Sequence, residues 1–492
     1  MIPDLCKRKE IIEMANIKKN FVYQTVYQIM SLILPLITSP ILARTLGAEG
    51  LGTYSYINTI VSYFILAANL GMYKYGIRSI AAVRDDKERL NSVFWEIWNL
   101  HKMISILIGI VYVGIGLTLK EYRLYYMIMF LSYIGGVINI NWLFFGIEEF
   151  KKIAIRDMII KMATFILIVC FVRADNGLLY YFIINAVGSL VANLIYWVMY
   201  KKYICKTRVN FKGTMSHLKP MLILFIPVLL ETLYTSMDKV MLGFMCAKSE
   251  VGYYENADKA LIARTIIYSI TTVLMPRMAN LLAKKDFKEF NRLMKQATGI
   301  TMLLSSAFAF GTAAIAREFS VIFWGEDFVQ CTNLIIVMAM AMPAVVLSRE
   351  VREQYLIPAN KDNEYILSAA SGAIFNFIAN AIMIPRIGAM GAAVATLLSE
   401  YIVLIVQLIV VKNELEMYKY IHGNEIYFLF GFIMFVFVRF IGQTLGIHLY
   451  SLFIEIFAGI LLYGVFCCGY WYVRKDTYYL SLFFNMLKKI KK

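Results

Sequence analysis

The chain has 492 residues, of which 60% are hydrophobic and only 17% carry a charge. Soluble proteins carry a charge on about a quarter of their residues, so this composition argues against a soluble globular domain. The net charge is +16, but the basic residues are scattered through short loops beside apolar runs. Membrane topology explains that distribution better than nucleic-acid binding, and we expect no nucleic-acid partner.

Apolar runs of about twenty residues, the length that crosses a bilayer as a helix, recur from one end of the chain to the other. The runs are continuous rather than alternating, which favours helices over a β-barrel. The expected fold is an all-α integral membrane protein with about 14 transmembrane helices. The expected spans are 21–43, 53–72, 93–119, 122–145, 153–172, 178–200, 219–243, 256–276, 293–316, 332–348, 364–385, 389–411, 425–442 and 449–473.

An internal repeat is visible at a spacing of about two hundred residues. Gly52–Tyr54 follows the first span as Gly252–Tyr254 follows the seventh. A later basic loop carries the same two residue types in both copies, Asp86 and Asn91 in the first and Asp286 and Asn291 in the second. The copies are six spans apart, an even number, so the repeat is parallel about an axis along the membrane normal.

The repeat predicts three parts of the chain. Residues 1–212 and 213–412 are expected to be two six-helix lobes related by a pseudo-two-fold axis. Residues 413–492 are expected to hold two further C-terminal helices and a basic cytoplasmic tail.

Polar residues within the spans are the candidates for a substrate cavity, because helical spacing puts each set on one face that must avoid lipid. An intramembrane charge costs roughly 2.5–3.5 kcal/mol on insertion scales, which favours a functional role. The alternative is structural, namely hydrogen bonds between helices, or an ion pair of Arg264 with Asp238 or Glu231. The candidates are Arg264, Asp238, Lys239, Glu231, Gln24, Gln28, Asn58, Asn69, Tyr268 and Lys161.

Catalytic and cofactor motifs are missing from the sequence. It has no HExxH, no GxSxG and no glycine-rich phosphate loop, and its seven cysteines lack metal-ligand spacing. We therefore expect no enzyme, no cofactor and no metal site.

Several segments resemble the polysaccharide repeat-unit flippases of the multidrug/oligosaccharidyl-lipid/polysaccharide exporter superfamily. These segments are Ala43–Tyr54, Asn69–Gly71, Gly76–Ala81, Met237–Gly243, Val251–Tyr254 and Gly388–Ala393. The resemblance implies a flippase that moves undecaprenyl-pyrophosphate-linked glycans between the leaflets of the bacterial inner membrane, through a cationic cavity between two lobes. Its partners would be the glycan and membrane lipids, with the polysaccharide polymerase and glycosyltransferases as further candidates. No site residue is carried over from the family.

Two other functions stay open on the sequence. A drug or metabolite exporter has the same fold, because a fold does not determine a substrate. A membrane polysaccharide polymerase would need a sizeable external loop for its active site, and the expected external loops are short.

The topology gives a first prediction. Loops on one side, together with both termini, carry roughly 36 lysines and arginines, and loops on the other side about seven. The positive-inside rule therefore places both termini in the cytoplasm. Reporter fusions at Met1 and Lys492 should both report the cytoplasm, and an external signal at either end would overturn the even number of spans.

Overall fold

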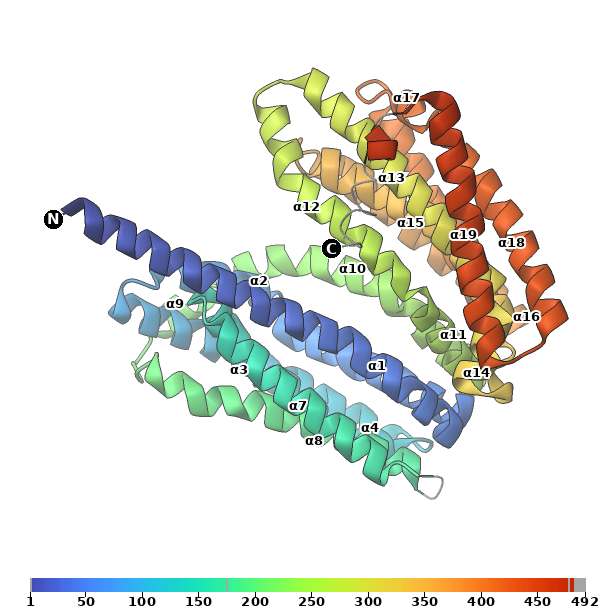
Figure 1. Ribbon diagram of the computed structural model, residues 1–492. Coiled ribbons are helices and arrows are strands. Elements are labelled where there is room, and N and C mark those ends of the chain that lie inside the picture. Colours follow the sequence, from blue (N-terminus) through green and yellow to red (C-terminus); the bar gives the residue numbers. More distant parts are fainter. Residues whose placement is uncertain (1, 174–175, 477, 482–492) are drawn as a thin grey trace. The chain divides into compact units, whose positions relative to one another are not determined.

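The computed structural model describes residues 2–173, 176–476 and 478–481, with side chains from Met30 onwards apart from Leu32 and Glu231. The described residues form helices and no strand. They fall into two compact units, Met1–Val240 and Met241–Lys492 (Figure 1). The all-α fold predicted from the sequence is confirmed.

Unit 1 consists of ten helices and one 3-10 turn, of which the last helix crosses the unit boundary. Its elements are α1 (Ile2–Asn69), α2 (Met72–Val83), α3 (Lys87–Thr118), α4 (Arg123–Ile128), α5 (Phe130–Val137), α6 (Asn141–Gly146), α7 (Phe150–Phe171), α8 (Gly177–Met199), η1 (Tyr200–Lys202), α9 (Phe211–Ser216) and α10 (Leu218–Met245).

Unit 2 consists of the remaining helices. Its elements are α11 (Lys248–Ala260), η2 (Leu261–Ala263), α12 (Arg264–Ala283), α13 (Phe287–Ala314), α14 (Ala316–Trp324), η3 (Glu326–Phe328), α15 (Cys331–Val351), η4 (Arg352–Leu356), α16 (Asp362–Val411), α17 (Met417–Ile421), α18 (Ile426–Leu445) and α19 (Leu449–Arg474). The unit boundary after residue 240 lies one membrane helix beyond the predicted lobe boundary at 212, and the superposition of the two predicted lobes stays a prediction.

Two long helices each contain two predicted spans, separated by a kink at a glycine. Gly47 in α1 has a φ of 63°, and Gly388 in α16 has a φ of 57°. Glycine adopts this left-handed region without a steric penalty, so the chain can bend there and cross the membrane again. At 1.5 Å per residue the 50 residues of α16 are about 75 Å long, roughly twice what one crossing needs.

Ten helical stretches among the described residues are long and apolar enough to cross a membrane, with α16 counted once. The predicted span 122–145 is broken into α4, α5 and α6. The predicted span 332–348 is too short, because the helix continues through η4 to Leu356.

The repeated basic loop has the same local role in both units. The side chain of Asp86 caps α3 by accepting from the backbone N–H of Glu88 and Arg89, and that of Asp286 caps α13. The amide oxygen of Asn91 accepts from the backbone N–H of Cys205 at 2.8 Å. That of Asn291 accepts from the hydroxyl of Tyr420, also at 2.8 Å. In both units the asparagine therefore holds a segment that follows the last predicted span of the lobe.

The last helix, α19, has one face that packs against protein and one face that is exposed. α18 and α19 pack side by side (Figure 1). One face of α19 buries Ser451, Glu455 and Gly459 at helical spacing, whereas Phe453 and Phe457 are each 65% exposed. An apolar exposed face is what a membrane helix presents to hydrocarbon, so a carboxyl on the opposite face is confined to protein.

Gly71 supplies a second prediction. Its φ is 77°, and a Cβ there would lie 2.6 Å from the carbonyl oxygen of Met221 in α10. Gly71→Ala should lower the free energy of unfolding by more than about 1–2 kcal/mol, the left-handed penalty alone. Thermal unfolding of the purified protein measures this. Gly114→Ala is the control, since no atom lies within 4 Å of its Cβ position, and equal effects of both changes would contradict the prediction.

Candidate functional site

A group of charged side chains in unit 2 lies where α12 packs against η4, the one-turn π-helix that continues α15. In this turn the backbone N–H of Ile357 donates to the carbonyl of Arg352, five residues earlier, at 3.0 Å. π-Turns are rare within α-helices, and those that do occur often lie at functional sites. This one keeps the arginines at the end of α15 within the helical bundle instead of in a loop.

Glu353 is the acceptor at the centre of this region. Its carboxylate lies 2.7 Å from Nη2 of Arg349 and 3.7 Å from Nη2 of Arg352. The hydroxyl of Thr271 on α12 donates to it at 2.8 Å. The Glu353 side chain is 10% exposed, and these donors replace the hydration that a buried carboxylate loses.

Arg264, the first residue of α12, has its own counter-ion. Its Nη2 lies 2.8 Å from Oδ1 of Asp258 on α11, and the two side chains are 32% and 31% exposed. Tyr268 follows one turn later, and the guanidinium of Arg349 lies 4.4 Å above its ring. A cation over an aromatic face is attracted by the ring quadrupole, so Tyr268 holds Arg349 beside the α12 helix.

We call Arg264, Arg349 and Arg352, with Tyr268, Asp258 and Glu353, the arginine cluster. Within the cluster three guanidiniums face two carboxylates, and a third carboxyl, that of Glu400, lies near enough to act on Tyr268. Each arginine is only about a third exposed, so the charge is accessible yet weakly screened. A planar guanidinium matches the oxygen geometry of phosphate, so the cluster is suited to bind a phosphorylated anion.

A clamp fixes the end of η4. The hydroxyl of Tyr355 donates to the carboxylate of Glu414, and Nζ of Lys361 lies 2.5 Å from the same carboxylate. These donors, Lys361 first and Tyr355 second, lower the pKa of Glu414 from its ordinary value. A lowered pKa means that the clamp stabilises the fold above the ordinary carboxyl pKa and that this contribution is lost as the pH falls.

Other predicted site residues lie in unit 1. The Nζ of Lys161 donates to the hydroxyl of Ser31 at 2.7 Å, so it joins α7 to α1. Asp238 is buried, whereas Lys239, Asn58 and Asn69 are half-buried. The side chains of Gln24, Gln28 and Glu231 lie outside the described residues. A role of these residues in binding substrate stays a prediction.

The structure also shows what the sequence interpretation missed. The acid beside Arg264 is Asp258, which is not among the predicted candidates. Arg349 and Arg352 lie beyond residue 348, the predicted end of their span, although the helix continues past it. The i, i+4 spacing of Arg349 and Glu353 was a usable signal of a continuing helix. Arg439 and Glu455, inside two predicted spans, were also overlooked.

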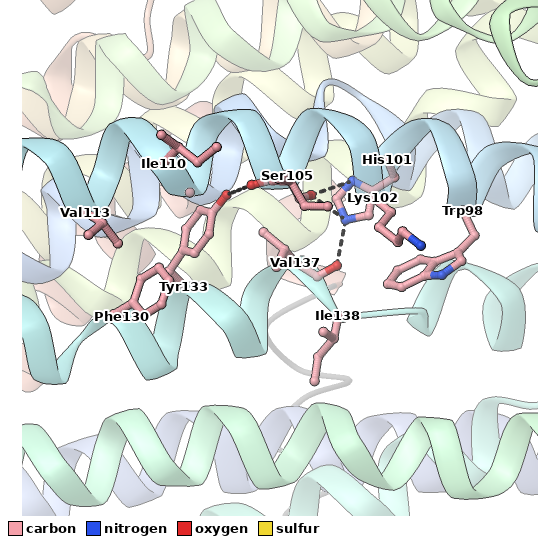
Figure 2. Close-up of a pocket in the computed structure, with 12 residues that line it drawn as sticks. Trp98, His101, Lys102, Ser105, Ile110, Val113, Phe130, Tyr133, Val137 and Ile138 are labelled. Atoms are coloured by element: carbon pink, nitrogen blue, oxygen red, sulfur yellow. Dashed lines mark hydrogen bonds between the residues drawn. The ribbon is translucent and has the colours of Figure 1, made fainter.

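A groove of about 620 Å³ lies in unit 1 between α3 and α5 (Figure 2). Its walls are mostly apolar, with Ile110 and Phe130 among them, and Lys102 also lines it. Deep in it lies His101, whose Nδ1 and Nε2 are 3.1 Å from the carbonyl oxygen of Ala68 and 2.6 Å from that of Val137. His101 therefore ties α3 to α1 and α5, and the apolar walls suit hydrocarbon rather than a sugar or a phosphate.

Comparisons with known proteins agree with this architecture. Residues 17–282 match the model of a family described as polysaccharide biosynthesis protein. A putative O-antigen transporter of Escherichia coli (strain K12) is 24% identical over 409 residues, which are 81% of this chain and 97% of that protein. The capsular polysaccharide biosynthesis protein CapF of Staphylococcus aureus is 24% identical over 79% of this chain and 97% of its own length.

A solved structure supports the fold independently. The lipid II flippase MurJ, in an inward closed conformation, is similar with a TM-score of 0.68, and the match covers 92% of this chain and 99% of that one. The two sequences are 18% identical, so the likeness concerns the fold alone.

Glu353 gives a third prediction. Glu353→Gln leaves two partly buried guanidiniums without their shared carboxylate, so the free energy of unfolding should fall by about 1–3 kcal/mol. Glu416→Gln is the control, because Glu416 pairs with Lys419 at the surface, where the side chains are 56% and 67% exposed, and ion pairs of this kind contribute little. A thermal midpoint that drops as far for the control as for Glu353→Gln would contradict the assigned role.

Proposed function

The chain belongs to the polysaccharide biosynthesis protein family, and on that premise we propose that it is a flippase for lipid-linked oligosaccharides. It carries undecaprenyl-pyrophosphate-linked repeat units from the cytoplasmic to the external leaflet of the bacterial inner membrane. Both termini are cytoplasmic. The polysaccharide polymerase and glycosyltransferases act beside it.

The arginine cluster is the observation that carries this proposal. Pyrophosphate is the part of the cargo that hydrocarbon excludes most strongly, so a carrier has to replace its hydration with fixed cations. Arg264 and Arg349 both lie beside Tyr268, and each is accessible. In the empty carrier, Asp258 and Glu353 offset the free-energy cost of partly burying the guanidiniums. Phosphate can displace these two acids as counter-ions when it binds.

Alternating access is the proposed mechanism. The sugar-pyrophosphate head enters the protein while the polyprenyl tail stays in the hydrocarbon, and the lobes rock to expose the head to the other side. Two negative charges that leave a negative interior gain about 4.6 kcal/mol per 100 mV, because each contributes about 2.3. The membrane potential therefore favours export. A drug exporter would be better served by an aromatic cavity poor in charge than by three arginines.

Arg264 supplies a fourth prediction. Arg264→Gln should lower glycan export about tenfold or more, since a hydrogen bond to a charged group is worth about 1.5–3 kcal/mol. Arg264→Lys should recover part of the loss, because it keeps the charge but not the planar fork. Export is measured in deletion cells as the fraction of complete lipid-linked repeat units that reaches the external leaflet. Cells without the protein should accumulate complete units on the cytoplasmic leaflet.

Two controls separate binding from stability. Arg292→Gln removes an exposed arginine that also pairs with a carboxylate, that of Glu289 at 2.6 Å, and export should stay normal. Full export by Arg264→Gln at normal protein levels would disprove the phosphate role. If Arg264→Gln instead abolishes expression and Asp258→Asn restores it, Arg264 is a structural partner. Unpolymerised units outside the deletion cells would identify a polymerase.

A further inference from the structure

A second group of intramembrane charges lies beside the connection between α18 and α19. Nη1 of Arg439 on α18 lies 2.9 Å from Oε2 and 3.2 Å from Oε1 of Glu318 on α14. It also lies 3.2 Å from the carbonyl oxygen of Ala314, the last residue of α13. The guanidinium therefore joins three helices of unit 2.

A second carboxyl shares this place. The position of a Cβ on Gly442 would be 2.9 Å from Oε1 of Glu455 and 3.1 Å from Oε1 of Glu318. Both acids therefore converge on a residue that has no side chain. Glu455 is completely buried, and neither of its oxygens has a hydrogen-bond partner among the described residues.

The charges around Glu455 do not balance if every group is ionised. Among the described residues, α14 contributes Glu318, α18 contributes Arg439, and α13 contributes the carbonyl of Ala314 but no charge. Arg317 is exposed, and His448 lies at the start of α19. One guanidinium thus serves two carboxylates, and it is already paired with the first. A second carboxylate, fully desolvated and without a donor, would cost several kcal/mol.

The neutral acid avoids this cost. When two carboxylates share a site, one of them keeps its proton, and the acid without donors is the one for which ionisation is most expensive. Arg439 is 22% exposed, whereas Glu318 is 3% exposed. The guanidinium is therefore the most open of the three groups, and both acids lie on its protein side.

We propose that Glu455 is a proton-binding site and that Arg439 is a switch between the two acids. With the proton bound, Glu455 is neutral and Arg439 pairs with Glu318 on α14. When the O–H bond of Glu455 breaks, the proton passes to water and the new carboxylate accepts N–H groups from Arg439. The guanidinium of Arg439 then holds α18 more tightly to α19, and it holds α18 less tightly to α14. The ligand is a proton, and the inference does not depend on which cargo the protein carries.

Infrared difference spectroscopy of the purified full-length protein in lipid tests the site, because a protonated carboxyl has a C=O stretch that a carboxylate lacks. At neutral pH the wild-type spectrum minus that of Glu455→Gln should contain one carboxylic acid band. Glu318→Gln should also lose this band, since Arg439 becomes free to stabilise ionised Glu455. Acid should restore the band in Glu318→Gln but not in Glu455→Gln.

Two further variants complete the test. Arg439→Gln should gain a second acid band, because neither carboxylate then has a counter-ion. Glu326→Gln removes an exposed acid after α14 and should leave the acid bands unchanged. Identical spectra of the wild type and Glu455→Gln at neutral pH would overturn the proposal, as would a band that survives in Glu318→Gln. If Glu318→Gln does not fold, the second acid band expected in Arg439→Gln becomes the test. A spectrum of Arg439→Gln without that second band would refute the switch.

Discussion

An ionised group inside a membrane helix needs a partner within the protein. Water and lipid cannot supply that partner at low cost, so each buried charge determines which helices must meet. Arg264 brings α12 to α11 through Asp258. Arg439 brings α18 to α14 through Glu318. The intramembrane charges therefore determine which helices pair, because apolar contacts between helices are less selective.

The same constraint explains why the two charged regions differ. In the arginine cluster the guanidiniums are partly exposed, and the role we propose for them is to bind an anion. Around Glu455 the acids outnumber the single arginine and are buried, so the surplus is relieved by a proton. The proposed phosphate site and the proposed proton site thus follow from the same constraint, and they differ in the sign of the charge and in exposure.

Departures from regular helix make these sites possible. The π-turn η4 keeps Arg352 and Glu353 inside the bundle. The kinks at Gly47 and Gly388 let a single helix cross twice without a loop. Gly442 leaves room for two carboxyls. An irregular backbone or a missing side chain reduces local stability. In this structure such positions coincide with helix bends or with polar groups inside the bundle.

Apolar length was enough to predict the fold class, the positions of most membrane helices and the breaks between the paired spans near residues 47 and 388, because it acts locally. The sequence also singled out Arg264 and Tyr268 as neighbours on one helical face. The partners of these two residues follow from the packing of whole helices. Asp258 reaches that face from the preceding helix α11, and Arg349 reaches it from α15, far along the chain. No helical periodicity in α12 predicts either partner, because their positions depend on how α11 and α15 pack against it.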